Sequence, residues 1–206
     1  MDIITRITRQ RGKMQIAISE QETIVVPLSL FRERPLTEGQ PSNLEEYDNW
    51  LMVRQYRHAL DRAVACLAAR AHSKHEIEQK LLRVGYRPCT VEMVLYKLER
   101  EHLLNDADFA RQWVEARSGR KLGRSRIAQE LRRKGIDADE AEEALSAIGE
   151  DAQLADALAL AENAAARAKS DENPRKTYQR IAAMLARRGF RWDIAKEALA
   201  QVLQAD

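Results

Sequence analysis

The sequence predicts a mainly α-helical protein, built as a tandem array of three three-helix modules that follow a small N-terminal β-hairpin or sheet. The composition supports helices: Ala, Leu, Arg, Glu and Gln are frequent, and the 206 residues include only eight Gly and five Pro. One helical pattern occurs three times along the chain, and the first 50 residues lack it. These observations predict an N-terminal extension over residues 1–50 and helices beyond it.

The N-terminal extension has the pattern of short strands. Residues 3–7, 14–18 and 23–26 are short and β-branched, and the segments RQRGK and SEQE between them are typical of turns. Residues 34–43, RPLTEGQPSN, predict a loop that leads into the first helix. A small antiparallel sheet or hairpin is therefore expected here.

The repeat becomes visible when the sequence is aligned on Gly85, Gly135 and Gly189. Eight residues before each glycine stands an isoleucine, four before stands a leucine, and directly after it stands a large apolar residue. These positions are Ile77, Ile127 and Ile181, then Leu81, Leu131 and Leu185, then Tyr86, Ile136 and Phe190. Apolar spacings of three and four predict an amphipathic helix before each glycine and a second helix after it.

Helix boundaries carry their own signals. Each glycine falls where a helix would end in a left-handed cap. Capping residues stand before three of the helices, and they are Ser73 with Glu76, Asp137 with Glu140, and Asn173 followed by Pro174. A further periodic segment precedes each pair, at residues 52–71, 105–118 and 151–169. The predicted modules therefore span residues 52–101, 105–148 and 151–204.

Charge is segregated along the chain although the net charge is only +2. Residues 117–135 hold eight Lys or Arg and one acid, residues 136–172 hold eleven acids and two bases, and residues 173–192 hold six bases and no acid. Such blocks predict docking to a polyanion or to a charged protein surface. The alternative is that these charges only cover the solvent side of amphipathic helices.

Two kinds of basic segment are candidate contacts with a partner. One kind lies in the loop and helix start near residues 117–126 and at the equivalent start near 175–180, where the helix dipole disfavours cations, so these side chains are expected to engage phosphate or acidic groups. The other kind precedes Gly135 and Gly189, where cations would also complement a helix C-terminus. The candidates are Arg117, Arg120, Lys121, Arg124, Arg126, Arg132, Arg133, Lys134, Arg175, Lys176, Arg180, Arg187 and Arg188.

The sequence predicts no catalytic residue, no cofactor and no metal site. It contains no Walker-type phosphate loop and no activated nucleophile motif, and the spacing of its His and Cys residues matches no compact zinc pattern. Phe109 and Trp113, four residues apart, are expected in a core, whereas the role of Trp192 is left open. Because no apolar stretch approaches about 20 residues and the start lacks a secretory signal, a cytoplasmic protein is expected. We also expect it to be a monomer.

Three linked segments resemble the RecX family, which regulates the RecA recombinase. They are SKHEIEQKL at residues 73–81, LNDADFA at 104–110 and GRSRIAQELRRKGI at 123–136, and the resemblance covers residues 54–204. It implies a protein that lies in the groove of a RecA filament on single-stranded DNA and limits its growth, ATP hydrolysis and strand exchange. The implied partners are the RecA filament and single-stranded DNA, bound weakly and without sequence preference, and no enzymatic activity is implied.

The chain departs from this pattern in two places. Val84 precedes the first glycine, where the other repeats carry Lys134 and Arg188, so a basic contact is missing from the first module. The N-terminal extension resembles one present in only some relatives, so its role does not transfer.

Two alternative functions remain open at this stage. One is a sequence-specific regulator that binds DNA through a unit like a helix-turn-helix, although the helix after Gly135, DADEAEEALSAI, is acidic and would repel phosphates. The other is a helical-repeat scaffold that binds no nucleic acid.

Overall fold

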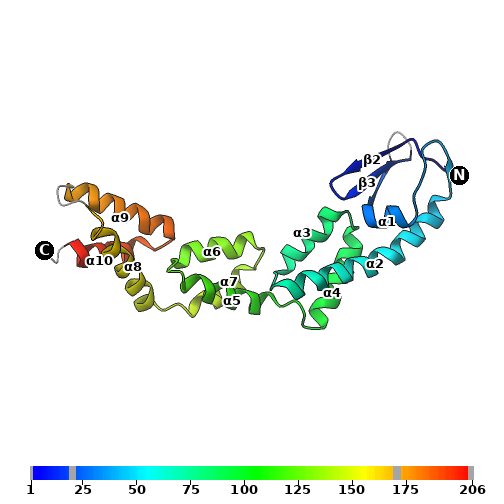
Figure 1. Ribbon diagram of the computed structural model, residues 1–206. Helices are drawn as coiled ribbons and strands as arrows, with labels where there is room; N and C mark the ends of the chain where they lie inside the picture. Colours follow the sequence, from blue (N-terminus) through cyan, green and yellow to red (C-terminus); the bar gives the residue numbers. More distant parts are fainter. Residues whose placement is uncertain (1, 19–21, 169–172, 204–206) are drawn as a thin grey trace. The chain divides into compact units, whose positions relative to one another are not determined.

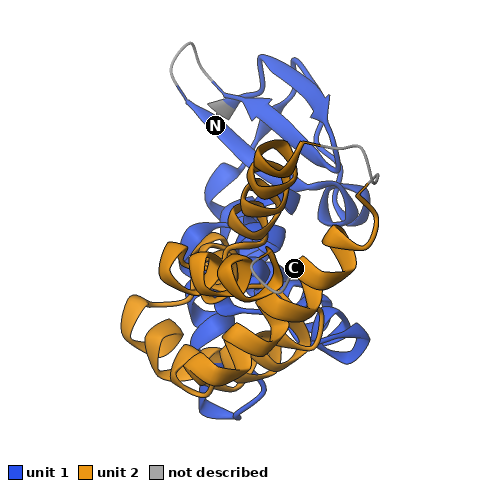
Figure 2. Cartoon of the chain, turned by 90° about the vertical axis from the view of Figure 1, so that its left-hand side faces the viewer, with its two compact units in different colours: residues 1–105 blue, residues 106–206 orange. Residues whose placement is uncertain are grey.

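The structure is a computed structural model that describes residues 2–18, 22–168 and 173–203. It contains short strands near the N-terminus, followed by helices along the rest of the chain (Figure 1). The chain divides into two compact units, Met1–Asn105 (unit 1) and Asp106–Asp206 (unit 2), which Figure 2 shows in different colours. The mainly α class with a small N-terminal sheet is therefore confirmed.

The N-terminal sheet is antiparallel and has the order β2–β3–β4, with β2 at Arg6–Gln10, β3 at Lys13–Ala17 and β4 at Thr23–Pro27. Ile16 pairs with Ile7 and Ile24, and its side chain is fully buried. The turn between β2 and β3 falls within the predicted RQRGK segment. The second predicted turn, SEQE, lies largely outside the described residues.

Three further short elements complete this part of unit 1. The short strands β1 (Asp2–Ile3) and β5 (Pro41–Ser42) pair with each other, so the predicted loop at 34–43 contains a brief strand. Helix α1 (Leu28–Glu33) was not predicted, because six residues are too few to display a helical period.

Unit 1 also contains the first three-helix module, α2–α4, which we call module 1. Helix α2 (Leu44–Ala69) begins eight residues earlier than its predicted start, because the Asn43 side chain accepts a hydrogen bond from the Glu46 amide and caps it there. Helices α3 (Lys74–Val84) and α4 (Pro88–Arg100) follow. The core of unit 1 joins this module to the sheet, since Ile4, Ile16 and Val26 belong to the same buried cluster as Ile77 and Leu81.

Unit 2 contains two further modules. Module 2 comprises α5 (Asp106–Ser118), α6 (Arg124–Arg133) and α7 (Ala138–Ser146), and module 3 comprises α8 (Glu150–Ala165), α9 (Pro174–Arg188) and α10 (Trp192–Leu203). Each module has its own buried cluster. The boundaries at 52–101, 105–148 and 151–204 stay predictions, because the chain itself clusters into two units.

The repeat positions are equivalent in the three cores. Ile77, Ile127 and Ile181 are all fully buried, and the large apolar residue after each glycine is 5% exposed in every module. Gly85, Gly135 and Gly189 all have positive φ angles, of 101°, 76° and 89°. The tandem repeat that the sequence predicts is therefore built as one recurrent packing unit.

The predicted capping residues act at their helices with one difference. Ser73 accepts a hydrogen bond from the Glu76 amide, and Asn173 accepts one from the Arg175 amide. Asp137 accepts from the amide of Asp139, one residue closer than the predicted partner Glu140.

Among the described residues, no helix is long and apolar enough to cross a membrane.

Modules 2 and 3 meet through a direct backbone contact at two glycines. The amide of Gly123 donates to the Arg188 carbonyl at 2.9 Å, and the amide of Ser125 donates to the Gly189 carbonyl at 3.1 Å. A Cβ atom at Gly123 would lie 2.2 Å from the Gly189 carbonyl carbon and oxygen. Only a residue without a side chain permits this approach, so Gly123 sets the packing of the two modules.

We expect Gly123→Ala to destabilise unit 2 by about 1–3 kcal/mol, because the added methyl group would overlap the Gly189 backbone. Urea unfolding followed by circular dichroism measures the change. Gly149→Ala is the matched control: both glycines are extended N-cap residues, but a Cβ at Gly149 meets nothing within 4 Å. Equal losses in the two variants would show that capping, and not the contact, explains the effect.

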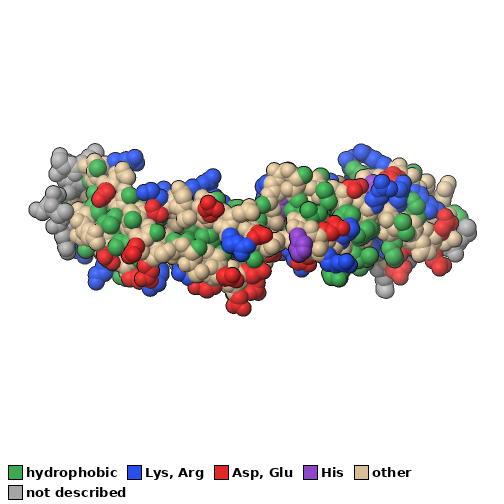
Figure 3. All heavy atoms as spheres, turned by 90° about the horizontal axis from the view of Figure 1, so that it is seen from below, with side chains coloured by type: hydrophobic (Ala, Val, Ile, Leu, Met, Phe, Trp, Pro, Cys, Tyr) green, Lys and Arg blue, Asp and Glu red, His purple; other side chains and the backbone are tan. Residues whose placement is uncertain are grey.

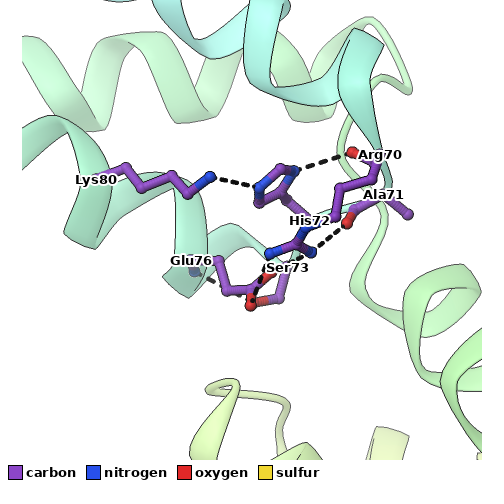
Figure 4. A network of polar contacts seen from close by, with 6 residues as sticks. All are labelled: Arg70, Ala71, His72, Ser73, Glu76 and Lys80. Atoms are coloured by element: carbon purple, nitrogen blue, oxygen red, sulfur yellow. Dashed lines mark hydrogen bonds and ion pairs between the residues drawn. The ribbon is translucent and has the colours of Figure 1, made fainter.

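A polar network fixes the start of α3 in unit 1 (Figure 4). The buried His72 ring donates from Nδ1 to the Arg70 carbonyl at 2.9 Å, and its Nε2 accepts from Lys80 Nζ at 2.6 Å. Arg70 also pairs with Glu76, whose amide donates to Ser73. A neutral imidazole that carries its proton on Nδ1 therefore makes both hydrogen bonds.

This network predicts a loss of stability in weak acid. Burial lowers the pKa of His72 below its ordinary value of 6.5, so the unfolded chain takes up a proton that the folded chain excludes. The free energy of unfolding should therefore fall as the pH drops below about 6.5, and chemical unfolding at about pH 7.5 and about pH 5.5 measures the difference. His72→Gln should reduce that difference, and an unchanged difference would exclude His72 as its source.

Candidate functional site

Inside module 2, Glu130 contacts two of the predicted partner-binding residues and one tryptophan. Arg117 Nε lies 2.7 Å from Glu130 Oε2, and Trp113 Nε1 donates to the same oxygen at 3.1 Å. Arg126 Nε lies 3.5 Å from the other carboxylate oxygen. The Arg117 guanidinium also lies over the Trp113 ring, 4.1 Å from its centroid. Arg117 therefore has a defined structural role in joining α5 to α6.

Lys134 also has an internal contact. Its ammonium lies 4.0 Å from the centroid of Trp113 and 5.4 Å from that of Phe109. The two rings stack on each other at 5.7 Å, and Phe109 is buried as the sequence predicts. Lys134 thus covers one aromatic face of the module 2 core.

The loop before α6 connects module 2 to module 3. Arg188 Nη1 donates to the carbonyls of Arg120 and Lys121 at 3.2 and 3.4 Å, and Lys121 Nζ lies 3.6 Å from an Asp156 carboxylate oxygen. The Arg124 side chain pairs with Glu142 on α7. Lys121 and Arg124, which the sequence places near a disfavoured helix start, thus receive partners from neighbouring helices.

A second group of the candidates points to solvent. These side chains are exposed, and they make no hydrogen bond or ion pair with any described residue. The group consists of Arg120, Arg132, Arg133, Arg175, Lys176 and Arg187. Arg180 is exposed as well and donates to the Ala164 carbonyl at 3.3 Å.

Most of these exposed cations lie on equivalent helices of two modules. On α6, the side opposite the buried Ile127 and Leu131 carries Arg126, Arg132 and Arg133, which we call the α6 basic face. On α9, opposite Ile181 and Leu185, the exposed residues include Lys176, Arg180 and Arg187, which we call the α9 basic face. Modules 2 and 3 therefore present cations from the same helix of the repeat.

The third helix of module 2 has the opposite charge. Within its nine residues, α7 carries Asp139, Glu140, Glu142 and Glu143, and acidic side chains gather over this part of unit 2 in Figure 3. Partial burial, together with the nearby carboxylates of Asp106 and Asp137, raises the pKa of Glu140. A helix of this charge repels phosphate and does not suit the groove of DNA.

The sequence analysis did not predict one basic residue, Arg83, as a candidate contact. Arg83 stands two residues before Gly85, as Arg133 and Arg187 do before their glycines, and it is exposed at the end of α3. The alignment on the three glycines contains the signal for it, which is an arginine two residues before each glycine. All three modules therefore end their middle helix with an exposed arginine.

Metal chemistry finds no support in the part of the chain that the structure describes. Within those residues, no three His, Cys, Asp or Glu side chains form a group that could hold a metal ion. Cys66 and Cys89 are free.

Family models match the three modules in order. The first three-helix domain of RecX matches residues 59–98, the second matches 105–145, and the third matches 151–199. Each match covers one of the helical repeats described above.

Individual relatives and solved structures agree with these matches. A regulatory protein RecX from Clostridioides difficile (strain 630) is 30% identical over 210 residues, covering 100% of this chain and 98% of the relative. One from Prosthecochloris aestuarii (strain DSM 271 / SK 413) is 36% identical over 152 residues, covering 71% of this chain and 95% of the relative.

Two crystal structures share the fold. That of a regulatory protein RecX aligns with a TM-score of 0.67 at 21% identity over 100% of both chains. That of RecX from Lactobacillus salivarius aligns with a TM-score of 0.68 at 26% identity, covering 75% of this chain and 99% of the other. The repeat architecture, the module matches and the full-length relative together show that this chain belongs to the RecX family of regulatory proteins.

Proposed function

We propose that this chain binds the RecA filament on single-stranded DNA and limits its growth, ATP hydrolysis and strand exchange. The observation that carries the proposal is the pair of basic faces on α6 and α9, which offer exposed cations from equivalent helices of two modules. A filament repeats the same acidic and phosphate groups along its length, so a repeated basic surface is suited to it.

The mode of action that we propose is binding, as a cytoplasmic monomer, and not catalysis. Arginine presents a planar fork of donors that fits carboxylate and phosphate groups equally well. The two basic faces can therefore contact RecA side chains, the DNA strand, or both. ATP hydrolysis then belongs to RecA, and the bound chain lowers its rate by limiting the filament.

The first test is the ATPase rate of RecA on single-stranded DNA during titration with this protein. The wild-type protein should lower the rate at substoichiometric ratios to RecA. Arg132→Gln with Arg133→Gln should raise the concentration needed for half-inhibition about tenfold, equivalent to about 1.4 kcal/mol. These side chains are suited to the test because neither makes a hydrogen bond or ion pair with a described residue.

Arg167→Gln with Lys196→Gln is the control for this variant. Both side chains are exposed in unit 2 and have no described hydrogen bond or ion pair, and the net charge changes by the same amount. The control should inhibit like the wild type. An unchanged ATPase rate with folded wild-type protein, or equal losses in the two variants, would contradict the proposal.

A second test separates this function from sequence-specific regulation of transcription. Binding to free DNA should be weak, strongly dependent on salt and indifferent to sequence, and it should tighten when RecA coats the strand. Fluorescence anisotropy with several duplexes and single strands measures this. A preference of several kcal/mol for one duplex sequence would favour the DNA-binding regulator instead.

A further inference from the structure

Unit 1 contains a strongly basic hollow, and none of its residues belongs to the α6 and α9 basic faces of unit 2. Its volume is about 530 Å³, and it is lined by the β2–β3 turn and by helices α1, α2 and α3. Among its ten described lining residues, five are basic and none is acidic. The basic residues are Arg11, Arg32, Arg62, Lys80 and Arg83.

The four arginines of the hollow lack a polar partner among the residues that the structure describes. Each is exposed, and none makes a hydrogen bond or ion pair with a described residue. Several other arginines of unit 1 pair with carboxylates, among them Arg34 with Glu46, Arg54 with Glu33, and Arg87 with Asp48. Like charges gathered without acids raise the electrostatic energy of the free protein, and an anion in the hollow would lower it.

Lys80 is held at the edge of this cluster. Its ammonium donates to His72 Nε2 at 2.6 Å, and the imidazole is in turn fixed by the Arg70 carbonyl (Figure 4). A neutral acceptor leaves the positive charge of Lys80 uncompensated. The hollow therefore keeps five positive charges close together.

The lining also indicates which part of a ligand is recognised. Its apolar residues are Leu28, Cys66 and Val84, and no aromatic side chain belongs to it. Bases of a single strand normally stack on aromatic rings, and protein interfaces normally bury aromatic or aliphatic anchors. A hollow with arginine forks and no aromatic ring in its lining suits phosphate groups.

We propose that this hollow binds the phosphate backbone of a nucleic-acid strand without sequence preference. This site goes beyond the basic faces of unit 2, because it is formed jointly by the N-terminal sheet, α1 and module 1. It also gives a role to the extension whose function the family resemblance leaves open. Arg83 supports the assignment, since it occupies the same repeat position as Arg133 and Arg187.

The test measures binding of fluorescein-labelled oligothymidine by anisotropy at several salt concentrations, with no RecA present. Arg62→Gln with Arg83→Gln should weaken binding several-fold. The slope of log affinity against log salt should become less steep by about 1.4, because each lost phosphate contact on a single strand removes about 0.7.

Arg57→Gln with Arg100→Gln is the matched control. Both arginines are exposed on helices of module 1, lie outside the hollow and have no described hydrogen bond or ion pair. This variant removes the same charge and should change the slope by less than half as much. Equal changes in the two variants would mean diffuse attraction, and no change in either would mean no site; both outcomes overturn the proposal.

A second variant guards against a folding defect in the first. Arg11→Gln with Arg32→Gln changes the turn and α1 and leaves α2 and α3 intact, and it should weaken strand binding in the same way. If either hollow variant bound oligothymidine normally but inhibited the RecA ATPase poorly, the hollow would recognise an acidic protein surface and the proposal would be wrong. Because the binding assay contains no RecA, its failure would leave the filament proposal standing.

Discussion

The three modules depend on one hydrogen-bonded turn at the end of each middle helix. The residue after the glycine donates its amide to the carbonyl of the leucine five residues before it, in Tyr86 to Leu81, Ile136 to Leu131 and Phe190 to Leu185. Positive φ at the glycine allows this bond, and the bond turns the following large side chain back into the core. The third helix of each module is positioned by this turn, and with it the whole repeat.

This constraint explains why the helical part of the fold was predictable from the sequence. The turn needs a glycine, and the core needs large apolar residues at fixed distances from it, so both leave a readable pattern. The early start of α2 left a weaker pattern, because its first turns contribute two residues, Tyr47 and Leu51, to the core that they share with the N-terminal sheet, and the cap is a single residue, Asn43. Helix α1 left none, since it has only one buried residue, Leu30.

The candidate site was less predictable because charge alone does not reveal a cation's partner. Arg124 and Arg132 are eight residues apart in the same basic segment, yet Arg124 pairs with Glu142 and Arg132 points to solvent. The difference lies in α7, which brings a carboxylate to one end of α6 only. Contacts between modules, such as Arg188 with the Arg120 carbonyl, likewise depend on packing that no local pattern encodes.

The distinction between paired and unpaired cations also indicates which of them are available to bind a partner. Exposed ion pairs contribute only about 0–1 kcal/mol, so the fold gains little by pairing an arginine and loses little by leaving one free. Scattered unpaired cations, such as Arg57 and Arg100, therefore do not indicate a binding site. Those on α6 and α9 lie on the same helix of the repeat, and four arginines of unit 1 line one hollow. Arg83 belongs to both arrangements, because it holds the repeat position and lines the hollow. The surface that we assign to the filament and the site that we assign to the strand thus share one feature of the repeat. Each contains an exposed arginine two residues before the glycine that makes no hydrogen bond or ion pair with a described residue.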